Sequence, residues 1–473
     1  MRQSVGHPQG RLRFLHRLRR GGELRLTQSA AAPGGPWRLA ACVTLAIAVA
    51  VLGPDDPALR AALAIFALTG ALWMTQALPL TLTALLVPLL AVLFAGVTPA
   101  RALASFAHPI IFLFLGGFAL AAALARHGLD RWLARRMLAL SGGRRASSLA
   151  LLFALTALLS MWISNTATAA MMLPLALGLL GPTADPRERT FVLLGVAYSA
   201  SIGGMGTLVG SPPNAIAAAQ AGIGFAEWMR FGLPLVVVLL PLMAATLWLV
   251  LRPALGGRIE LPADDGDESW TPGRIATAAV FAFAVSGWMF GAPLARALGV
   301  EQDIDAVVAL AAIVLLVAGR AVDWPDIESH TQWGVLLLFG GGLALSALMG
   351  SSGASRFLAD ALTGLLRGTP DWLVLLGIVA FVVMLTELVS NTASAALLVP
   401  VFAALAPDFG LDPRALSAAI AISASCAFML PVATPPNALV FGTGHVSAAS
   451  MMRCGLLLNA VCIGVITLYA QVL

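Results

Sequence analysis

Two copies of one short polar sequence stand out in an otherwise apolar chain. Residues 164–166 and residues 390–392 both read Ser-Asn-Thr, and in each copy a proline follows nine residues after the asparagine. These side chains supply oxygens that can bind a cation and N–H and O–H groups that can bind an anion. An unpartnered amide or hydroxyl in hydrocarbon costs roughly 2–7 kcal/mol, so such residues need partners at membrane depth. The two motifs predict a cavity that binds a small charged solute, in preference to two ordinary polar turns.

The composition indicates a helical integral membrane protein. Of the 473 residues, 59% are hydrophobic and 11% are charged, and the mean hydropathy is +0.90. Apolar runs of about twenty residues recur along the chain, whereas a membrane barrel would show alternating segments of about ten. A net charge of +5 would suggest nucleic acid in a soluble protein, but most arginines here flank apolar runs, where they set orientation. We therefore expect the lipid bilayer as a partner and no nucleic acid.

Each Ser-Asn-Thr motif lies in the middle of an apolar segment that is too long for one span. These segments are residues 146–180 and 371–405. A single helix of that length, at about 1.5 Å per residue, would overshoot a hydrocarbon core of about 30 Å. Broken at the motif, each segment gives two half-helices, which favours a re-entrant hairpin. A Pro-Pro-Asn sequence follows each hairpin, at 212–214 and 435–437. Paired prolines cannot continue a helix, so an interrupted helix is predicted there.

The halves of the chain repeat the same landmarks. The spacing from a glycine-rich helix to the motif asparagine is 48 residues in the first half and 49 in the second. From that asparagine to the Pro-Pro-Asn asparagine it is 49 and 46 residues. The landmarks are Gly117, Asn165 and Asn214, and then Gly342, Asn391 and Asn437. This register predicts an internal duplication.

Charge predicts how the two repeats are oriented. Residues 126–145 carry six arginines, whereas their counterpart, residues 353–368, carries only Arg356 and Arg367. The positive-inside rule places the first stretch in the cytoplasm and permits the second outside. We therefore predict an all-α polytopic membrane protein with two inverted-topology repeats, about 11 transmembrane helices and two re-entrant hairpins, an arrangement typical of secondary transporters. The N-terminus is expected in the cytoplasm and the C-terminus outside the inner (plasma) membrane.

The predicted divisions follow from these patterns. They are a disordered cytoplasmic tail at 1–36, a first transmembrane helix at 37–54, repeat 1 at 55–252 with its hairpin at 146–180, a cytoplasmic loop at 253–273, and repeat 2 at 274–473 with its hairpin at 371–405.

The hairpin tips suit both signs of charge. The start of a half-helix presents unpaired N–H groups and about half a positive charge, which favours an anion. The end of a half-helix and an unwound loop present carbonyl oxygens, which favour a hard cation such as Na⁺. No Arg or His lies inside either motif or either Pro-Pro loop. The charge of a bound anion must therefore be balanced by helix dipoles and co-bound cations, which couples anion binding to cation binding.

Both Ser-Asn-Thr motifs, together with Ser425–Val440, resemble the divalent anion/sodium symporter family of INDY-type dicarboxylate and sulfate carriers, over residues 55–473. The resemblance implies a first Na⁺ site from Ser160, Ser164, Asn165 and the loop at Gly210, and a second from Thr386, Asn391 and the loop at Ala433. It implies a substrate site between Asn165, Thr166, Asn391 and Thr392, with Ser211, Thr434 and Pro435 nearby. It also implies a homodimer in which a transport domain moves like an elevator against a scaffold domain.

The leading functional hypothesis is Na⁺-coupled symport of a small divalent anion, a C4-dicarboxylate such as succinate, malate or fumarate. A sulfate symporter and a Na⁺-independent dicarboxylate exchanger of the same fold are the alternatives, and the intact Asn and Ser/Thr residues at both implied cation sites favour Na⁺. A membrane enzyme would need a nucleophile–base pair or a metal cluster at membrane depth, which the sequence lacks. A channel is disfavoured because hairpins from opposite sides suit alternating access.

One acidic residue lies inside the second hairpin. Glu387 precedes Asn391 by four residues, and the equivalent position in the first half is Met161. An acid at membrane depth is a functional candidate. It can carry a proton, or it can cap a polar network inside the hairpin, and we favour the second interpretation.

Overall fold

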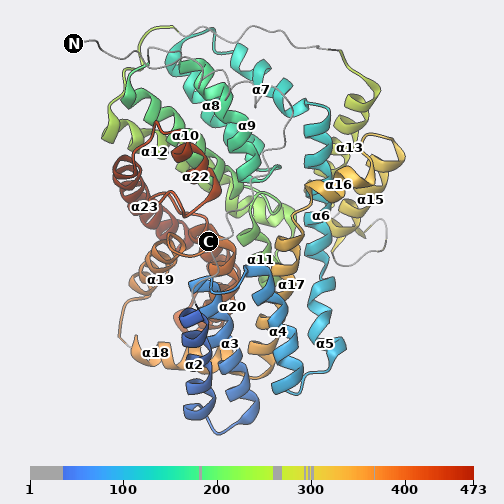
Figure 1. Cartoon of the computed structure of the whole chain (residues 1–473), viewed down its shortest axis with the longest axis vertical. Helices are drawn as coiled ribbons and strands as arrows, with labels where there is room; N and C mark the ends of the chain where they lie inside the picture. Colours follow the sequence, from blue (N-terminus) through green and yellow to red (C-terminus); the bar gives the residue numbers. More distant parts are fainter. Residues whose placement is uncertain are drawn as a thin grey trace, which may run out of the picture.

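The computed structural model describes residues 36–180, 184–258, 269–291, 295, 296, 299, 303–366 and 368–472. Across these residues the regular structure is helical, apart from one isolated bridge between Arg144 and Arg258. Figure 1 shows the helices packed into one elongated body. The tail predicted at 1–36 lies outside the described residues, except for Pro36.

The first half forms a series of helices interrupted at polar sequences. Its helices are α2 (Pro36–Leu52), α3 (Pro57–Thr75), α4 (Leu80–Phe94), α5 (Pro99–Leu103), the 3-10 helix η1 (Ala104–Ala107), α6 (Pro109–Arg126), α7 (Leu129–Ala139), α8 (Arg145–Ser160), α9 (Asn165–Leu180), α10 (Pro186–Gly204), α11 (Pro212–Ala221) and α12 (Phe225–Leu251). Capping residues set several boundaries. Asp56 and Asp185 each accept hydrogen bonds from the first turn of the following helix, which begins with a proline.

The second half repeats much of this order. Its helices are α13 (Pro272–Met289), α15 (Ile304–Ala318), α16 (Trp324–His330), α17 (Trp333–Ser351), α18 (Ala354–Leu365), α19 (Asp371–Thr386), α20 (Asn391–Leu405), the 3-10 helix η2 (Ala406–Phe409), α21 (Pro413–Ala424), α22 (Pro435–Gly442) and α23 (Ala448–Ala470).

The predicted helix breaks are confirmed in both halves. Helix α8 ends just before the first Ser-Asn-Thr motif and α9 begins at its asparagine, and α19 and α20 do the same at the second motif. Residues 205–211 separate α10 from α11, and residues 425–434 separate α21 from α22. Helices α11 and α22 both begin at the paired prolines, which fit the first turn because its N–H groups have no intrahelical partner.

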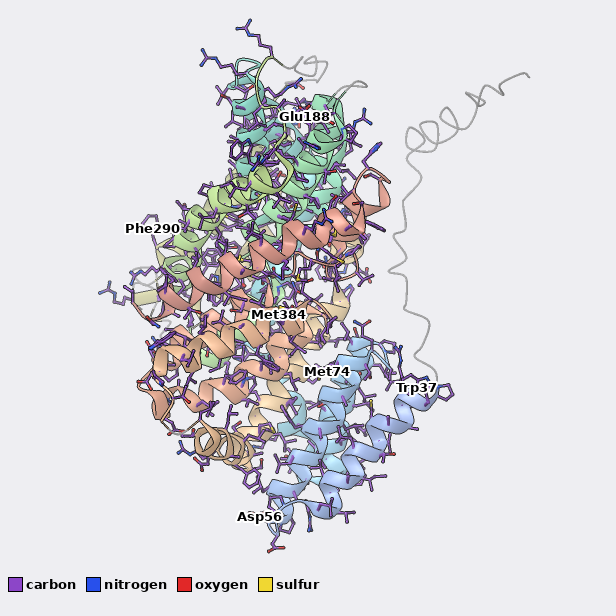
Figure 2. All side chains as sticks on the ribbon, turned by 90° about the vertical axis from the view of Figure 1, so that its left-hand side faces the viewer. Trp37, Asp56, Met74, Glu188, Phe290 and Met384 are labelled. Atoms are coloured by element: carbon purple, nitrogen blue, oxygen red, sulfur yellow. The ribbon has the colours of Figure 1, made fainter. Side chains whose placement is uncertain are left out.

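The two halves interlock around these breaks. Helix α11 of the first half packs against α20 and α21 of the second, while α22 packs against α9 and α10. A second group, formed by α3, α4, α6, α13, α15 and α17, packs beside them (Figure 1). In the same view α7 lies near the top of the molecule and α18 near the bottom, with the interlocked breaks between them. Figure 2 shows Glu188 and Asp56 toward opposite ends of the long axis, with Met384 between.

The helices have the length and composition of membrane spans. Within the described residues, six stretches are long and apolar enough to cross a membrane, and six further apolar helices are shorter. Trp37, Met74 and Met384 are exposed apolar side chains on the face seen in Figure 2. Exposed apolar side chains suit contact with lipid. Helices on either side of a polar break are individually short, and the number of about 11 transmembrane helices stays a prediction.

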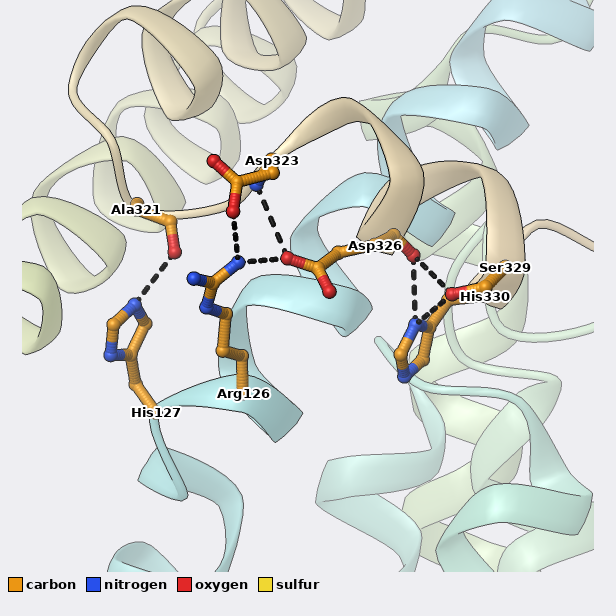
Figure 3. Close-up of polar contacts among 7 residues, drawn as sticks. All are labelled: Arg126, His127, Ala321, Asp323, Asp326, Ser329 and His330. Atoms are coloured by element: carbon orange, nitrogen blue, oxygen red, sulfur yellow. Dashed lines mark hydrogen bonds and ion pairs between the residues drawn. The ribbon is translucent and has the colours of Figure 1, made fainter. Parts of the chain in front are cut away.

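An ion-pair cluster joins the end of α6 to α16 (Figure 3). Arg126 lies 3.0 Å from Asp323 and also bonds Asp326, and the neighbouring His127 Nε2 lies 2.7 Å from the carbonyl oxygen of Ala321. The carboxylate of Asp326 also accepts from the backbone N–H of Asp323 and so caps α16. The cluster fixes α16 to α6, a helix of the second group.

Candidate functional site

The first hairpin tip gathers a hydroxyl, an amide and backbone carbonyls. Ser160 is the last residue of α8, and its Oγ lies 2.7 Å from Asn165 Oδ1 and 2.7 Å from the carbonyl oxygen of Ala200. Both oxygens are acceptors, yet a serine hydroxyl has one proton to donate. Two oxygens therefore compete for one hydrogen. We call Ser160, Asn165 and the carbonyls facing them the first oxygen cluster.

The amide of Asn165 faces a ring of acceptors. With the amide turned so that its nitrogen points inward, that nitrogen would lie 2.7 Å from Ser160 Oγ, 3.1 Å from the carbonyl oxygen of Ala200 and 3.2 Å from that of Gly210. Which end of an amide points inward is decided by its hydrogen-bond network. An N–H group can satisfy these oxygens, and so can a hard cation that binds the amide oxygen with them. The set includes three of the four predicted ligands of the first Na⁺ site.

The second hairpin tip repeats this arrangement with threonine in place of serine. Thr386 is the last residue of α19, and its Oγ1 lies 2.8 Å from Asn391 Oδ1 and 2.7 Å from the carbonyl oxygen of Ala424. Again one hydroxyl proton faces two acceptors. Thr386, Asn391 and the carbonyl of Ala424 form the second oxygen cluster. The same geometry at equivalent positions of both halves is what the duplication predicts.

Buried asparagines hold the unwound loops that follow. Asn214 Nδ2 donates to the carbonyls of Gly204 and Thr207 at 2.8 and 2.7 Å. Asn437 Nδ2 donates at 3.0 and 3.1 Å to carbonyls ten and seven residues before it, the same offsets as in the first half. Both asparagines are fully buried. They therefore provide partners for carbonyl oxygens left without helix hydrogen bonds where the chain unwinds.

Glycine is required where the first loop crosses the first oxygen cluster. A Cβ on Gly204 would lie 2.4 Å from Asn165 Oδ1, and a Cβ on Gly210 would lie 2.6 Å from the carbonyl oxygen of Gly204. Real Cβ atoms essentially never approach so closely. The backbone of α10 and its loop can thus reach the motif asparagine only because these side chains are absent.

The two halves meet beside the clusters. Ser211 Oγ, at the start of α11, lies 3.4 Å from Ser425 Oγ of the second loop. The hydroxyl of Tyr198 on α10 donates to the carbonyl of Phe428 at 2.6 Å. Thr434 Oγ1 accepts from the N–H of Asn437 at 3.3 Å and so caps α22. The Ser211 and Tyr198 contacts join the first repeat to the second loop.

The remaining predicted residues have less specific surroundings. Ser164 Oγ accepts from the N–H of Ala167 at 3.3 Å and so caps α9. Thr166 and Thr392 are half-buried, and neither hydroxyl bonds another residue that the structure describes. Pro435 is exposed at the first turn of α22, and Ala433 is half-buried beside it. Within the described residues, no hydrogen bond links the two motifs directly.

Two carbonyls of the clusters were not predicted from the sequence. The oxygens of Ala200 and Ala424 belong to alanines in α10 and α21, whose side chains give no sign of such a role. Their place follows only from how each hairpin tip packs against the next helix.

Glu387, whose role the sequence left open, has a well-defined geometry. Its carboxylate accepts from three successive N–H groups, which fits the cap of a polar network.

Comparison with known proteins identifies the family. A family model described as citrate transporter, CitMHS, matches residues 71–421 and again 306–473. An uncharacterized transporter of Haemophilus influenzae is 47% identical over 423 residues, 87% of this chain and 91% of that protein. The sodium-dependent dicarboxylate transporter SdcS of Staphylococcus saprophyticus is 33% identical over 434 residues, 84% of this chain and 82% of that protein.

Solved structures of membrane transporters share the fold. The MtrF structure of Neisseria gonorrhoeae matches with a TM-score of 0.54 at 14% identity, covering 81% of this chain and 84% of MtrF. The YdaH transporter of Alcanivorax borkumensis matches with a TM-score of 0.52 at 16% identity, covering 78% of this chain and 86% of YdaH. These likenesses concern the fold alone. The family match and the relatives together show that the chain is a membrane transporter of the citrate transporter family, within the divalent anion/sodium symporter group that its two motifs resemble.

Proposed function

We propose that the protein carries a small divalent anion, a C4-dicarboxylate such as succinate, malate or fumarate, together with Na⁺. The observation that carries this proposal is the matched gathering of hydroxyl, amide and carbonyl groups in both oxygen clusters. In each, one hydroxyl lies within 2.8 Å of two acceptor oxygens, in a buried setting where lone pairs need partners. A cation satisfies such a set of oxygens at both equivalent places. The dicarboxylate and the dependence on sodium also appear in the name of the relative SdcS.

The cations would be held by hydroxyl, amide and backbone oxygens. In the first site these are Ser160, Ser164, Asn165 and Gly210, with Ala200 added by the geometry. In the second they are Thr386, Asn391 and Ala433, with Ala424 added. Because each hydroxyl already points its oxygen into its cluster, binding an ion requires no new fold, only a change of hydrogen-bond partner.

The substrate site would lie between the hairpin tips. Asn165 and Asn391 begin α9 and α20, so unpaired N–H groups and the positive ends of two helix dipoles favour an anion there. The hydroxyls of Thr166 and Thr392 are free to donate to a carboxylate, and Ser211, Thr434 and Pro435 lie at the neighbouring loops. Two similar half-sites suit the two carboxylates of a dicarboxylate better than one compact sulfate.

Coupling follows from the absence of fixed positive side chains. Neither motif nor either Pro-Pro loop contains Arg or His, so a dianion binds tightly only when cations offset its charge. By linkage, the anion must tighten cation binding by the same factor. A carrier built in this way moves the two solutes together.

The transport cycle we propose is an elevator movement in a homodimer. The proposed topology is inverted repeats with two re-entrant hairpins, the N-terminus in the cytoplasm and the C-terminus outside the plasma membrane. What supports it is that α7 and α18, the interfacial helices of the two repeats, lie toward opposite ends of the molecule (Figure 1). The interlocked helices α8–α12 and α19–α23 would form the moving body, and the group around α3, α4, α6, α13, α15 and α17 the scaffold.

Uptake of labelled succinate into proteoliposomes tests this function. We expect uptake that rises sigmoidally with an inward Na⁺ gradient and is inhibited by malate and fumarate more strongly than by sulfate. Citrate belongs among the competitors because the family description names it. Stronger inhibition by sulfate would assign a sulfate symporter, and uptake indifferent to Na⁺ would assign an exchanger. Protein-free liposomes with the same gradient are the control.

A further inference from the structure

Arginines from distant segments of the chain meet at one end of the molecule. Arg135 lies on α7, and Arg144 directly precedes α8, which packs against α7. An isolated antiparallel bridge joins Arg144 to Arg258, and beside it the backbone N–H of Arg145 donates to the carbonyl of Gly257 at 3.1 Å. In Figure 1 both helices lie toward the same end of the long axis. We call Arg135, Arg144 and Arg258 the arginine patch.

The arginine patch has no acidic partners of its own. Arg144 and Arg258 are exposed and Arg135 is half-buried. The neighbouring Arg145 pairs with Glu188 at 3.4 Å, whereas the structure, in the residues it describes, gives no ion pair to any member of the patch. An arginine stays protonated in proteins, so the patch carries three positive charges that the described chain does not balance.

The bridge itself calls for an anion. Residues directly opposite each other in an antiparallel pair have Cβ atoms about 4.5–5.5 Å apart, and like charges at such positions are destabilising. Arg144 and Arg258 are paired in this way. The orientation of a membrane protein requires only that arginines lie on one side of the bilayer, and it gives no reason for two of them to face each other. An anion between them turns the repulsion into two attractions.

The opposite end of the molecule balances its charge internally. Helix α18 follows α17 as α7 follows α6, and its Arg356 pairs with Asp360 at 2.7 Å and with Asp408 at 3.2 Å. The chain thus supplies the carboxylates for the arginine of α18. At the α7 end the matching anion has to come from outside the protein.

The surroundings of the arginine patch suit a lipid better than a soluble anion. Helix α7 begins three residues after the end of α6, which closes a stretch apolar enough to cross a membrane. Leu140, between α7 and Arg144, is 78% exposed. Trp270 is also exposed, and its ring meets that of Trp132 on α7 edge-on at 5.5 Å. Tryptophans of this kind are enriched where hydrocarbon meets the head groups. The patch therefore lies where a charged head group and its acyl chains occur together.

We propose that the arginine patch binds the phosphate head group of an anionic phospholipid whose acyl chains lie against Leu140 and Trp270. Each guanidinium presents paired N–H groups that match phosphate oxygens. A phosphate between Arg144 and Arg258 holds the bridge closed and so ties residue 258 to the start of α8. This inference goes beyond the proposed transport and requires neither Na⁺ nor a dicarboxylate.

The test is thermal unfolding of the purified full chain in detergent micelles, titrated with phosphatidylglycerol or with phosphatidylcholine of the same acyl chains. Phosphatidylglycerol should stabilise the wild type more, because it alone carries a net negative charge. Arg144→Gln should raise the phosphatidylglycerol concentration of half-maximal stabilisation about fivefold, the loss expected for one arginine near an anionic surface. Arg101→Gln, an exposed arginine on α5 at the other end of α6, is the matched control and should leave this midpoint unchanged.

The order of stabilities in the two lipids separates lipid binding from a structural role. With phosphatidylcholine the bridge opposes two like charges, so Arg144→Gln should be at least as stable as the wild type. With saturating phosphatidylglycerol the wild type should be the more stable protein. A variant that is less stable than the wild type by the same amount in both lipids would show a structural arginine and overturn the proposal.

Arg258→Gln repeats both measurements from the other side of the bridge, so the test stands if Arg144→Gln is not recovered as folded protein. Equal stabilisation of the wild type by the two lipids would overturn the proposal, and so would wild-type midpoints in both variants. Inorganic phosphate at the same concentrations should not stabilise the protein. If it reproduced the effect of phosphatidylglycerol, the arginine patch would bind a soluble anion and the lipid would be the wrong occupant.

Discussion

Substitution of Gly204 by alanine tests the first oxygen cluster through one methyl group. The added Cβ would lie 2.4 Å from Asn165 Oδ1 and 3.0 Å from its Cγ and Nδ2, so the asparagine must move. Overpacking of this kind costs about 1–3 kcal/mol. Because Asn165 is the shared member of the proposed cation and substrate sites, the displacement should also weaken Na⁺ binding. A cost of about 1.4 kcal/mol in binding corresponds to a tenfold higher Na⁺ requirement.

A second glycine in the same hairpin provides the control. Gly178 lies in α9, has a helical backbone and has nothing within 4 Å of the position of an added Cβ. Gly178→Ala should change stability by less than about 1 kcal/mol and leave Na⁺ dependence unchanged. The assay is succinate uptake into proteoliposomes as a function of Na⁺, alongside thermal unfolding of both variants. If Gly204→Ala shows the Na⁺ dependence of Gly178→Ala, Asn165 is not where the reasoning requires it.

Three further predictions follow from other parts of the molecule. Thr386→Val removes the hydroxyl but keeps the shape of the side chain, and should raise the Na⁺ concentration needed for uptake about tenfold. Thr386→Ser keeps a hydroxyl and should show the wild-type Na⁺ requirement. Equal uptake by both variants would contradict a hydroxyl ligand. A single cysteine near Arg135 should be labelled only from the cytoplasmic side and one near Asp360 only from outside, and labelling of both from one side would refute the inverted topology. Burial raises the pKa of Asp130 on α7, so its ionised form destabilises the fold above the folded pKa. Asp130→Asn should therefore raise the thermal stability at neutral pH, and this gain should disappear as the pH falls to the pKa of an ordinary aspartate, about 3.9. A gain in stability that does not depend on pH would contradict this explanation.

Helix breaks were predictable from the sequence because their causes are local. A Ser-Asn-Thr motif inside an apolar segment and a pair of prolines inside another apolar run each prevent a continuous helix, and α8 to α11 break where these residues lie. A duplication is equally predictable because it preserves spacing. The side-chain members of both oxygen clusters, Ser160 and Thr386, were instead implied by the family resemblance, and they occupy equivalent positions five residues before the motif asparagines.

The rest of the site depends on tertiary packing, which leaves no local signal. The carbonyls of Ala200 and Ala424 enter the clusters because α10 and α21 pack against the hairpin tips. Asn459 reaches Glu387 from α23, 72 residues further along the chain. The cap that Ser164 makes on α9 also follows from packing, and its part as a Na⁺ ligand, which the family resemblance implies, stays a prediction.

Reciprocal binding of Na⁺ and succinate tests the central claim, that the two oxygen clusters hold the cations that balance the anion. Binding of labelled succinate to the purified wild-type protein would be measured over a range of Na⁺ concentrations, and Na⁺-dependent stabilisation with and without saturating succinate. We predict that succinate binds only in Na⁺ and that each solute tightens the other by the same factor. Tight succinate binding in choline, with Na⁺ affinity indifferent to succinate, would contradict the account.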